Sequence, residues 1–282
     1  MSVFSDIDTS GRVESLLRYL DDTDVSMSAL KSYIVAAANR YAPSGPVLDL
    51  GCGVGHDLVR LTAAGLAAVG VDPSANALER ASAVHPALVQ GDGARLPFLD
   101  ASFGGCRIER VLQHVEDPGL VLDEVIRVVK PGGFLAVLEP DQTSLAVETE
   151  LPIDSGILGR WVTARHASIG ARLPDLMRDR GCHVDDVITE ASFGYALDRI
   201  PVVAEAVLAR AVEAAGLTSS QREAWLHEQA QRSEQGRFQA SWTKYLVIAR
   251  APGADRAIGG RHTASLVART TPPIARASIR LA

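Results

Sequence analysis

Short apolar runs alternate with amphipathic segments through most of this 282-residue chain. Between the runs, apolar residues recur at the spacing of one helix face, as they do at Leu122, Val125 and Val129. This alternation predicts a parallel sheet with helices on both faces. The apolar runs that predict its first five strands cover residues 47–50, 67–71, 87–90, 105–108 and 134–138.

The pattern changes after residue 170. A helical stretch at 173–180 precedes an apolar run at 182–189, and a final apolar run covers 241–249. Two amphipathic helices are expected between these runs, at 201–215 and 219–235. The last two strands would form a hairpin, so we expect a doubly wound, Rossmann-like α/β sheet of seven strands with the last one antiparallel.

The first predicted strand leads directly into a glycine turn. Gly51, Gly53 and Gly55 occupy alternate positions, and an amphipathic helix follows at once. Glycine lets the backbone turn sharply and lets a ligand lie against it, while the first N–H groups of the helix point toward that ligand. The dinucleotide fingerprint has the different spacing G-x-G-x-x-G. A turn that binds no ligand is the alternative.

Acidic residues close the next two predicted strands. Asp72 lies 21 positions after Gly51, where a carboxylate can accept hydrogen bonds from both hydroxyls of a ribose. That geometry suits nicotinamide and methionine cofactors equally. Asp92 lies in a glycine turn after the third strand, where ordinary turn chemistry is the alternative to ligand binding.

Four linked stretches resemble the class I S-adenosylmethionine-dependent methyltransferases of the ubiquinone/menaquinone type. They are DLGCGVG at 49–55, Asp72, GDGARLPF at 91–98, and the segment from HVEDP to PGG at 114–133. The resemblance implies S-adenosylmethionine as cofactor and methyl transfer to an O, N or C atom of a small-molecule metabolite. The residues that it assigns to the cofactor are Asp49, Gly51, Gly53, Gly55, Asp72, Pro73, Asp92, Gly93 and Glu109.

Methyl transfer requires alignment of the nucleophile with the methyl carbon and the sulfur, and it requires a base only if the nucleophile retains its proton. His114, which follows the fourth strand, is the first candidate base, and Glu109 is the second. The alternative for His114 is a loop histidine that supports the neighbouring helix. For Glu109 the alternatives are a contact with the cofactor's amino group or an ion pair with Arg107 or Arg110. Arg107 needs such a partner, because it stands inside a strand.

The resemblance also implies that segments around the core cover the acceptor. We expect a helical cover at 1–45, a methyltransferase domain at 46–250, and a flexible tail at 251–282. Within the domain, an inserted helical cover at about 142–170 and the helices at about 201–235 would close over the site. Candidate acceptor contacts are Tyr19, Tyr33, Arg110, Asp141, Trp161 and His166. For the tyrosines, packing of the helices onto the sheet is the alternative.

Composition narrows the function classes. A formal net charge of −6 provides no general basic field, so we expect no nucleic-acid partner. No apolar run approaches the roughly 20 residues that cross a bilayer, and no signal sequence is recognisable, so we expect a cytoplasmic protein without a membrane partner. Three separated cysteines and the lack of an HExxH motif predict no metal site. The expected assembly is a monomer or a homodimer.

Three other functions remain open. An NAD-dependent oxidoreductase is disfavoured by the glycine spacing and by the predicted last strand. The same fold could catalyse a non-methylating cyclisation or rearrangement, since Gly104 replaces the acid usual after Phe103 in the family that the chain resembles. A non-enzymatic binding or partner subunit is the third.

Overall fold

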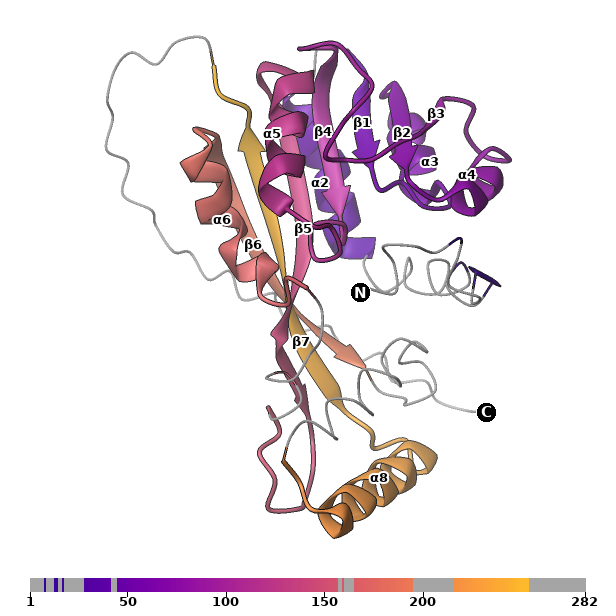
Figure 1. Ribbon diagram of the computed structural model, residues 1–282, viewed down its shortest axis with the longest axis vertical. Helices are drawn as coiled ribbons and strands as arrows, with labels where there is room; N and C mark the ends of the chain where they lie inside the picture. The colour runs from indigo at the N-terminus through magenta and orange to yellow at the C-terminus, as the bar shows by residue number, and fades with distance from the viewer. Residues whose placement is uncertain are drawn as a thin grey trace, which may run out of the picture.

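A seven-stranded mixed sheet forms the centre of the protein in the computed structural model (Figure 1). The structure describes residues 8, 13, 14, 17, 28–41, 45–156, 159, 165–194 and 216–253. The strand order is β3-β2-β1-β4-β5-β7-β6, and β7 is antiparallel to both of its neighbours. This confirms the predicted sheet. Its strands are β1 (Val47–Leu50), β2 (Ala68–Asp72), β3 (Leu88–Gln90), β4 (Phe103–Glu109), β5 (Val129–Val147), β6 (His183–Gly194) and β7 (Ala240–Arg250).

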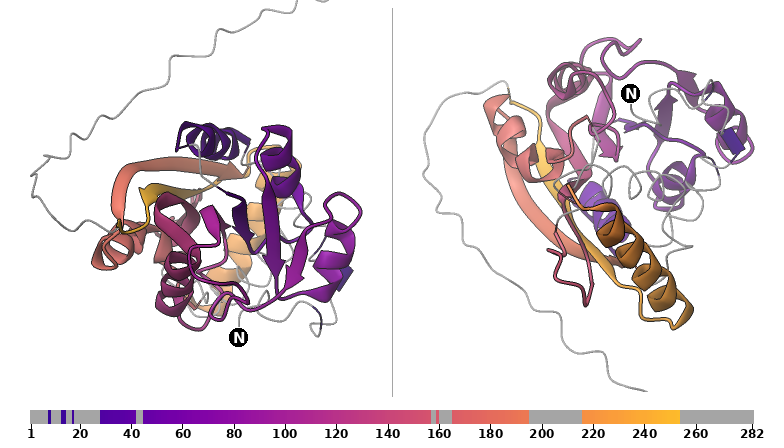
Figure 2. Two further views of the ribbon diagram at one scale, coloured as in Figure 1. Left: turned by 90° about the horizontal axis from the view of Figure 1, so that it is seen from above. Right: turned by 60° about the horizontal axis from the view of Figure 1, so that its bottom comes forward.

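Helices cover both faces of this sheet (Figures 1 and 2). On one face, α2 packs Leu30 and Ile34 against β5 and β7. On the other face, α5 and α6 pack Leu122 and Leu173 against β4 and β5. The described helices are α2 (Ser28–Tyr41), α3 (His56–Ala63), α4 (Ala75–Ala81), α5 (Pro118–Val128), α6 (Ile169–Asp179) and α8 (Ser219–Glu234).

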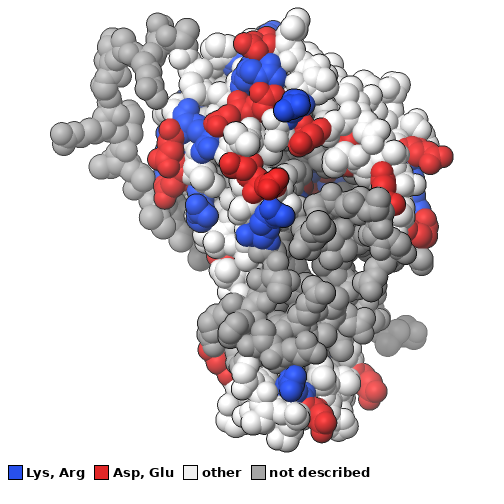
Figure 3. Space-filling view, in the orientation of Figure 1, with Lys and Arg blue, Asp and Glu red and all other residues white. Residues whose placement is uncertain are grey.

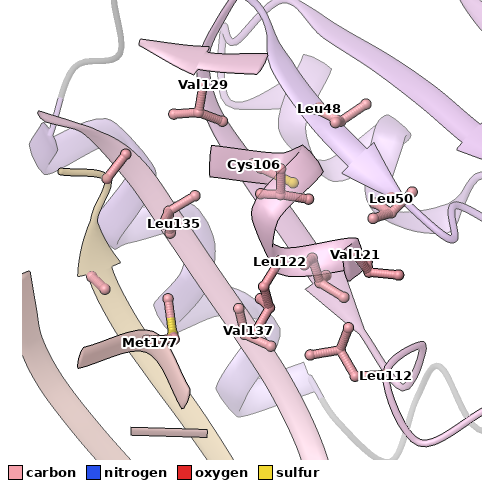
Figure 4. Close-up of a cluster of buried hydrophobic side chains, with 14 of the residues drawn as sticks. Leu48, Leu50, Cys106, Leu112, Val121, Leu122, Val129, Leu135, Val137 and Met177 are labelled. Carbon is pink, nitrogen blue, oxygen red and sulfur yellow. The ribbon is translucent and has the colours of Figure 1, made fainter. Parts of the chain in front are cut away.

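The largest core cluster lies between the sheet and α5 (Figure 4). Alternate residues of the strands enter it, because successive side chains of a strand point to opposite faces. Leu135 and Val137 of β5 therefore belong to this cluster, while Phe134 and Ala136 belong to the cluster under α2. All of β4 and residues 134–140 of β5 are buried on both faces, as is typical of central strands in a sheet that has helices on both sides.

Side chains cap the starts of two of these helices. The Ser74 hydroxyl accepts a hydrogen bond from the Ala77 amide at the start of α4. The Asp117 carboxylate accepts from the Gly119 amide at 2.7 Å, and Pro118 occupies the first turn of α5. Side-chain oxygens at these positions satisfy amides that have no partner inside the helix.

Strand β5 is much longer than predicted. The expected helical cover from residue 142 is wrong at its start, because residues 142–147 continue the strand as far as Val147, which pairs with Ala240. An irregularity in the register between Asp141 and Ala146 bends the strand without ending it. Pairing with β4 ends at Leu138, but pairing with β7 on the other edge of β5 continues to Val147. As a result, β5, β6 and β7 extend beyond the rest of the sheet (Figure 1).

Helix α8 lies at the far end of this extension (Figures 1 and 2). A capping box at Thr218 and Gln221 starts it, and Glu228 accepts hydrogen bonds from the Thr149 hydroxyl and the Glu150 amide. This confirms the helix predicted at 219–235. The helix predicted at 201–215, most residues of the predicted cover before Ser28, and nearly all of the tail lie outside the described residues.

Within the described residues, no helix combines the length and the apolar character that a membrane span requires. On the face shown in Figure 3, basic and acidic side chains are interspersed rather than gathered into a patch of one sign.

Packing around α5 makes a first prediction. Leu122 is buried in the main cluster, whereas Leu120 on the same helix is 54% exposed. We expect Leu122→Ala to lower the free energy of unfolding by about 2–5 kcal/mol, because it leaves a cavity in the core. Leu120→Ala, the matched control, should change it by less than about 0.5 kcal/mol. Urea denaturation measures both, and equal effects would contradict this packing.

Candidate functional site

The glycine turn between β1 and α3 exposes backbone rather than side chains. Gly51 has φ +73°, and a Cβ placed on it would lie 2.2 Å from the Val111 Cγ2 atom. No L-residue fits there without displacing Val111 or the turn. The Gly51 amide donates to the Val71 carbonyl at 2.8 Å, which fixes the turn against the end of β2. Helix α3 begins immediately after Gly55.

Asp72 connects the end of β2 to this turn. Its Oδ2 accepts from the Gly53 amide and its Oδ1 from the Ser74 amide, both at 2.9 Å. The residue is 7% exposed, and burial raises the pKa of its carboxyl. Each carboxylate oxygen can accept a second hydrogen bond. Asp72 therefore fits a ligand with two adjacent hydroxyls that rests on the turn.

The other candidate cofactor residues near Asp72 follow the same edge of the sheet. Gln90 pairs with Asp72 and donates to the Pro73 carbonyl at 3.0 Å. Two residues later, the exposed Asp92 accepts from the Ala94 amide at 2.9 Å, as in an ordinary Asx turn. A Cβ on Gly93 would lie 3.3 Å from Leu50 Cδ2, so a larger residue would crowd the end of β1.

A cluster of buried charges lies on the α2 side of the sheet. The Arg107 Nη1 atom lies 2.6 Å from Asp49 Oδ1, and its Nη2 lies 2.5 Å from Asp57 Oδ2 and contacts Glu109 Oε2. These carboxylates come from β1, from the first turn of α3 and from the end of β4. We call these four residues, together with Lys31, the Arg107 cluster.

Lys31 joins α2 to this cluster. Its Nζ lies 2.7 Å from Asp57 Oδ2 and 3.3 Å from Glu109 Oε2. Burial alone would raise the pKa of Asp57, but the positive charges of Arg107 and Lys31 hold it below its ordinary value. Burial raises the pKa of Asp49 to about 6 in spite of Arg107, and Asp49 Oδ2 has no hydrogen-bond partner among the described residues.

Asp49 and Glu109, two of the residues predicted to bind the cofactor, both have their carboxylates engaged inside the fold. The side chain of Asp49 is fully buried, that of Glu109 is 3% exposed, and both are paired with Arg107. The alternative for Glu109 is confirmed instead, because an Arg110 Nε–Glu109 Oε1 contact of 3.3 Å accompanies the pair with Arg107. Both acids support the glycine turn from inside the fold.

Glu139 positions the loop after β4. Its Oε1 accepts from the amides of Val111 at 2.7 Å and Leu112 at 2.6 Å, and burial raises the pKa of its carboxyl to about 8. The preceding residue of this loop, Arg110, has φ +54°, and its amide donates to the Leu138 carbonyl. A left-handed conformation is unusual for arginine and is often found at functional sites. Glu139 is not among the site residues predicted from the sequence.

His114 is poorly suited to be the base. Burial and the charge of Arg110 lower the pKa of His114 to about 3, so its imidazole has little affinity for a proton. His166, which was predicted to cover the site, does lie beside this loop, with its Nε2 3.3 Å from the Glu116 carbonyl. These two histidines thus lie on the same part of the molecule.

Two of the candidate acceptor contacts, Tyr33 and Asp141, form hydrogen bonds with other residues of the protein. The Tyr33 hydroxyl donates to Asp186 of β6 at 2.5 Å, so this tyrosine fastens α2 to the sheet and forms no wall of the site. The Asp141 carboxylate accepts from the amide and hydroxyl of Thr143 within its own turn. Tyr19 and Trp161 lie outside the described residues. In the described part of the chain, no group of three or more His, Cys, Asp or Glu side chains could hold a metal ion.

Comparisons with known proteins agree on one family. Residues 48–137 match the methyltransferase domain family. An uncharacterized 37.1 kDa protein in a transposon of Streptomyces fradiae is 36% identical over 256 residues, which cover 84% of this chain and 71% of that protein. A demethylmenaquinone methyltransferase of Corynebacterium kroppenstedtii is 39% identical over 97 residues, 34% of this chain. This chain spans only 42% of that enzyme's length.

A solved structure supports the fold. The crystal structure of a proposed methyltransferase from Bacillus halodurans C-125 superposes with a TM-score of 0.53 at 18% identity, over 78% of this chain and 99% of that one. The seven-stranded sheet with an antiparallel seventh strand is therefore shared well beyond the glycine turn.

Glu139 makes a prediction about pH dependence. Its carboxyl holds a proton in the folded protein up to about pH 8, whereas the unfolded chain loses that proton near pH 4.5. Its contribution to stability is therefore present at acidic pH and is lost as the pH rises through this interval. We expect Glu139→Gln to become more stable relative to the unsubstituted protein between pH 5 and pH 8, by about 1–3 kcal/mol.

Urea denaturation at the two pH values measures this difference. Glu116→Gln, an exposed position in the same region, is the matched control and should show no such trend. A stability difference for Glu139→Gln that is constant from pH 5 to pH 8 would rule out a buried, protonated carboxyl.

Proposed function

The chain belongs to the S-adenosylmethionine-dependent methyltransferase family, and on this premise we propose that it methylates an O, N or C atom of a small-molecule metabolite. The observation that supports this most is the bare glycine turn at Gly51, Gly53 and Gly55 with the Asp72 carboxylate beside it. A ligand can lie directly on such a backbone, and Asp72 can accept from its hydroxyls.

Residues along the edge of the sheet would each hold one part of the cofactor. The glycine turn would hold the amino-acid end, Asp72 the ribose hydroxyls and Asp92 the amino group of adenine. When bound, the cofactor supplies an electrophilic methyl group on a positively charged sulfur. The protein's own contribution is to hold this group in line with an acceptor and to exclude water.

The order of the strands separates the cofactor from the acceptor. The proposed cofactor residues follow β1, β2 and β3, which form one side of the sheet. An in-line displacement places the acceptor on the opposite side of the methyl group from the sulfur. The acceptor would therefore lie toward the ends of β4 and β5, where Arg110, His114 and His166 are found.

Isothermal calorimetry tests this proposal directly. We expect the protein to bind S-adenosylmethionine and S-adenosylhomocysteine and not NAD. Asp72→Ala and Asp92→Ala should each weaken binding of S-adenosylhomocysteine by about 1–3 kcal/mol for the lost hydrogen bonds, which is about 5- to 150-fold. Tight binding of NAD alone, or unchanged affinity in both variants, would refute the cofactor assignment.

The glycine turn allows a second, independent test. Gly51→Ala places a methyl group against Val111, and we expect it to weaken binding of S-adenosylhomocysteine at least about tenfold. Gly65→Ala is the matched control, because Gly65 has a similar φ of +81° and no other atom within 4 Å of the new Cβ. Each variant has backbone strain of about 1–2 kcal/mol. If both lose affinity equally, strain rather than the shape of the turn is responsible.

A further inference from the structure

Lys244 is a buried lysine that the cofactor site does not use. It lies on β7, opposite Pro140 of β5 and Glu190 of β6, and is 5% exposed. Pro140 follows Glu139, whose carboxyl group holds the loop after β4. Lys244 therefore lies where the parallel part of the sheet ends, on the side proposed for the acceptor.

The surroundings of Lys244 differ from those of the other buried lysine. Lys31 has carboxylate oxygens at 2.7 and 3.3 Å, whereas no acid among the described residues lies within 4.0 Å of Lys244 Nζ. That Nζ lies 5.9 Å from the centroid of the Trp242 ring. A buried ammonium without an ion-pair partner is unfavourable, and such groups are found more often at functional sites than elsewhere.

The charges that face Lys244 come from three directions. Glu190 belongs to β6, Glu109 and Arg110 stand at the end of β4, and Lys31 belongs to α2. Burial lowers the pKa of Lys244 to about 8; Arg110 and Lys31 lower it as well, and Glu190 and Glu109 oppose them. At pH 7, about one tenth of Lys244 is therefore an uncharged amine that can accept a proton, far more than for a lysine with its ordinary pKa.

We propose that Lys244 is the general base that removes the proton from a phenolic or enolic hydroxyl of the acceptor, an inference that rests on the proposed methyl transfer. Lys244 Nζ takes the hydroxyl proton and becomes an ammonium. The electron pair on the oxygen forms the bond to the methyl carbon, and the pair of the methyl–sulfur bond returns to sulfur. The ammonium then releases its proton to water.

The chemistry of this side of the site favours such an acceptor. Proton transfer is most efficient when the acid and the base have similar pKa values. A phenol or an enol meets this condition for a lysine amine, whereas an ordinary alcohol is too weak an acid. Arg110 and Lys31 would stabilise the anionic oxygen that forms and would repel an ammonium acceptor. Trp242, beside Lys244, offers an apolar face on which a flat ring can stack.

The proton affinity of Lys244 is measured first, without any substrate. The chain contains only three lysines, Lys31, Lys130 and Lys244, so competitive acetylation with acetic anhydride, followed by peptide mass spectrometry, resolves each one. We expect the reactivity of Lys244 to rise with a midpoint near pH 8. A midpoint above pH 10 would overturn the proposal.

A coloured phenol tests the position of Lys244. We expect the ionisation constant of 4-nitrophenol bound to the protein with S-adenosylhomocysteine to show at least about a tenfold increase over that of free 4-nitrophenol, which corresponds to a pKa about one unit lower. Lys244→Met should abolish this increase, Lys244→Arg should keep it because it keeps the charge, and Lys130→Met, the matched control, should leave it unchanged. The same ionisation in Lys244→Met as in the unsubstituted protein would overturn the proposal.

Calorimetry with S-adenosylhomocysteine separates this inference from the proposed function. Affinity within twofold of the unsubstituted protein shows that Lys244→Met is folded and that the cofactor site is intact. If the unsubstituted protein does not bind S-adenosylhomocysteine, the proposed function itself is refuted. If S-adenosylhomocysteine binds but the acetylation midpoint of Lys244 lies above pH 10, only the proposed role of Lys244 is refuted.

Discussion

The buried guanidinium of Arg107 is the constraint on which the rest of the site depends. It neutralises carboxylates from β1, α3 and β4, and these elements flank or adjoin the glycine turn. Removing one partner from a buried ion cluster generally costs about 3–5 kcal/mol, because the remaining charges are left unpaired. The turn can present bare backbone to a ligand because this cluster holds both of its ends from inside the fold. Lys31 attaches α2 to the same cluster, so the helix that covers the sheet is also tied to the turn.

A second set of contacts divides the edge of the sheet into two regions. Asp72 secures the turn on the β2 side, and Glu139 secures the loop after β4 with two backbone hydrogen bonds. Most of the acids near the site are therefore engaged in holding backbone. Lys244 differs from them, because it is buried and no acid among the described residues lies within ion-pair distance of it. Under the proposed function, β1–β3 would bind the cofactor, and proton transfer would take place on the β4–β7 side.

Much of this arrangement could be predicted from local sequence, and some of it could not. The glycine turn after the first strand and Asp72 at the end of the second depend on neighbouring residues, and each was found where expected. The Arg107 cluster depends on the pairing of β1 with β4, which are more than 50 residues apart, so the sequence indicated only that Arg107 needs a partner. The length of β5 depends in the same way on β7, about 100 residues later. Lys244 lacked any local motif, and only its burial and neighbours made it distinctive.

A crystal structure of the protein with S-adenosylhomocysteine tests the central claim most directly. The account predicts that the ligand lies across the glycine turn, with its ribose hydroxyls on the Asp72 carboxylate and its sulfur directed toward the end of β4. The Arg107 cluster should be unchanged beneath it. A ligand bound elsewhere, or a turn that must break its hydrogen bond to Asp72 to admit the ligand, would contradict the account.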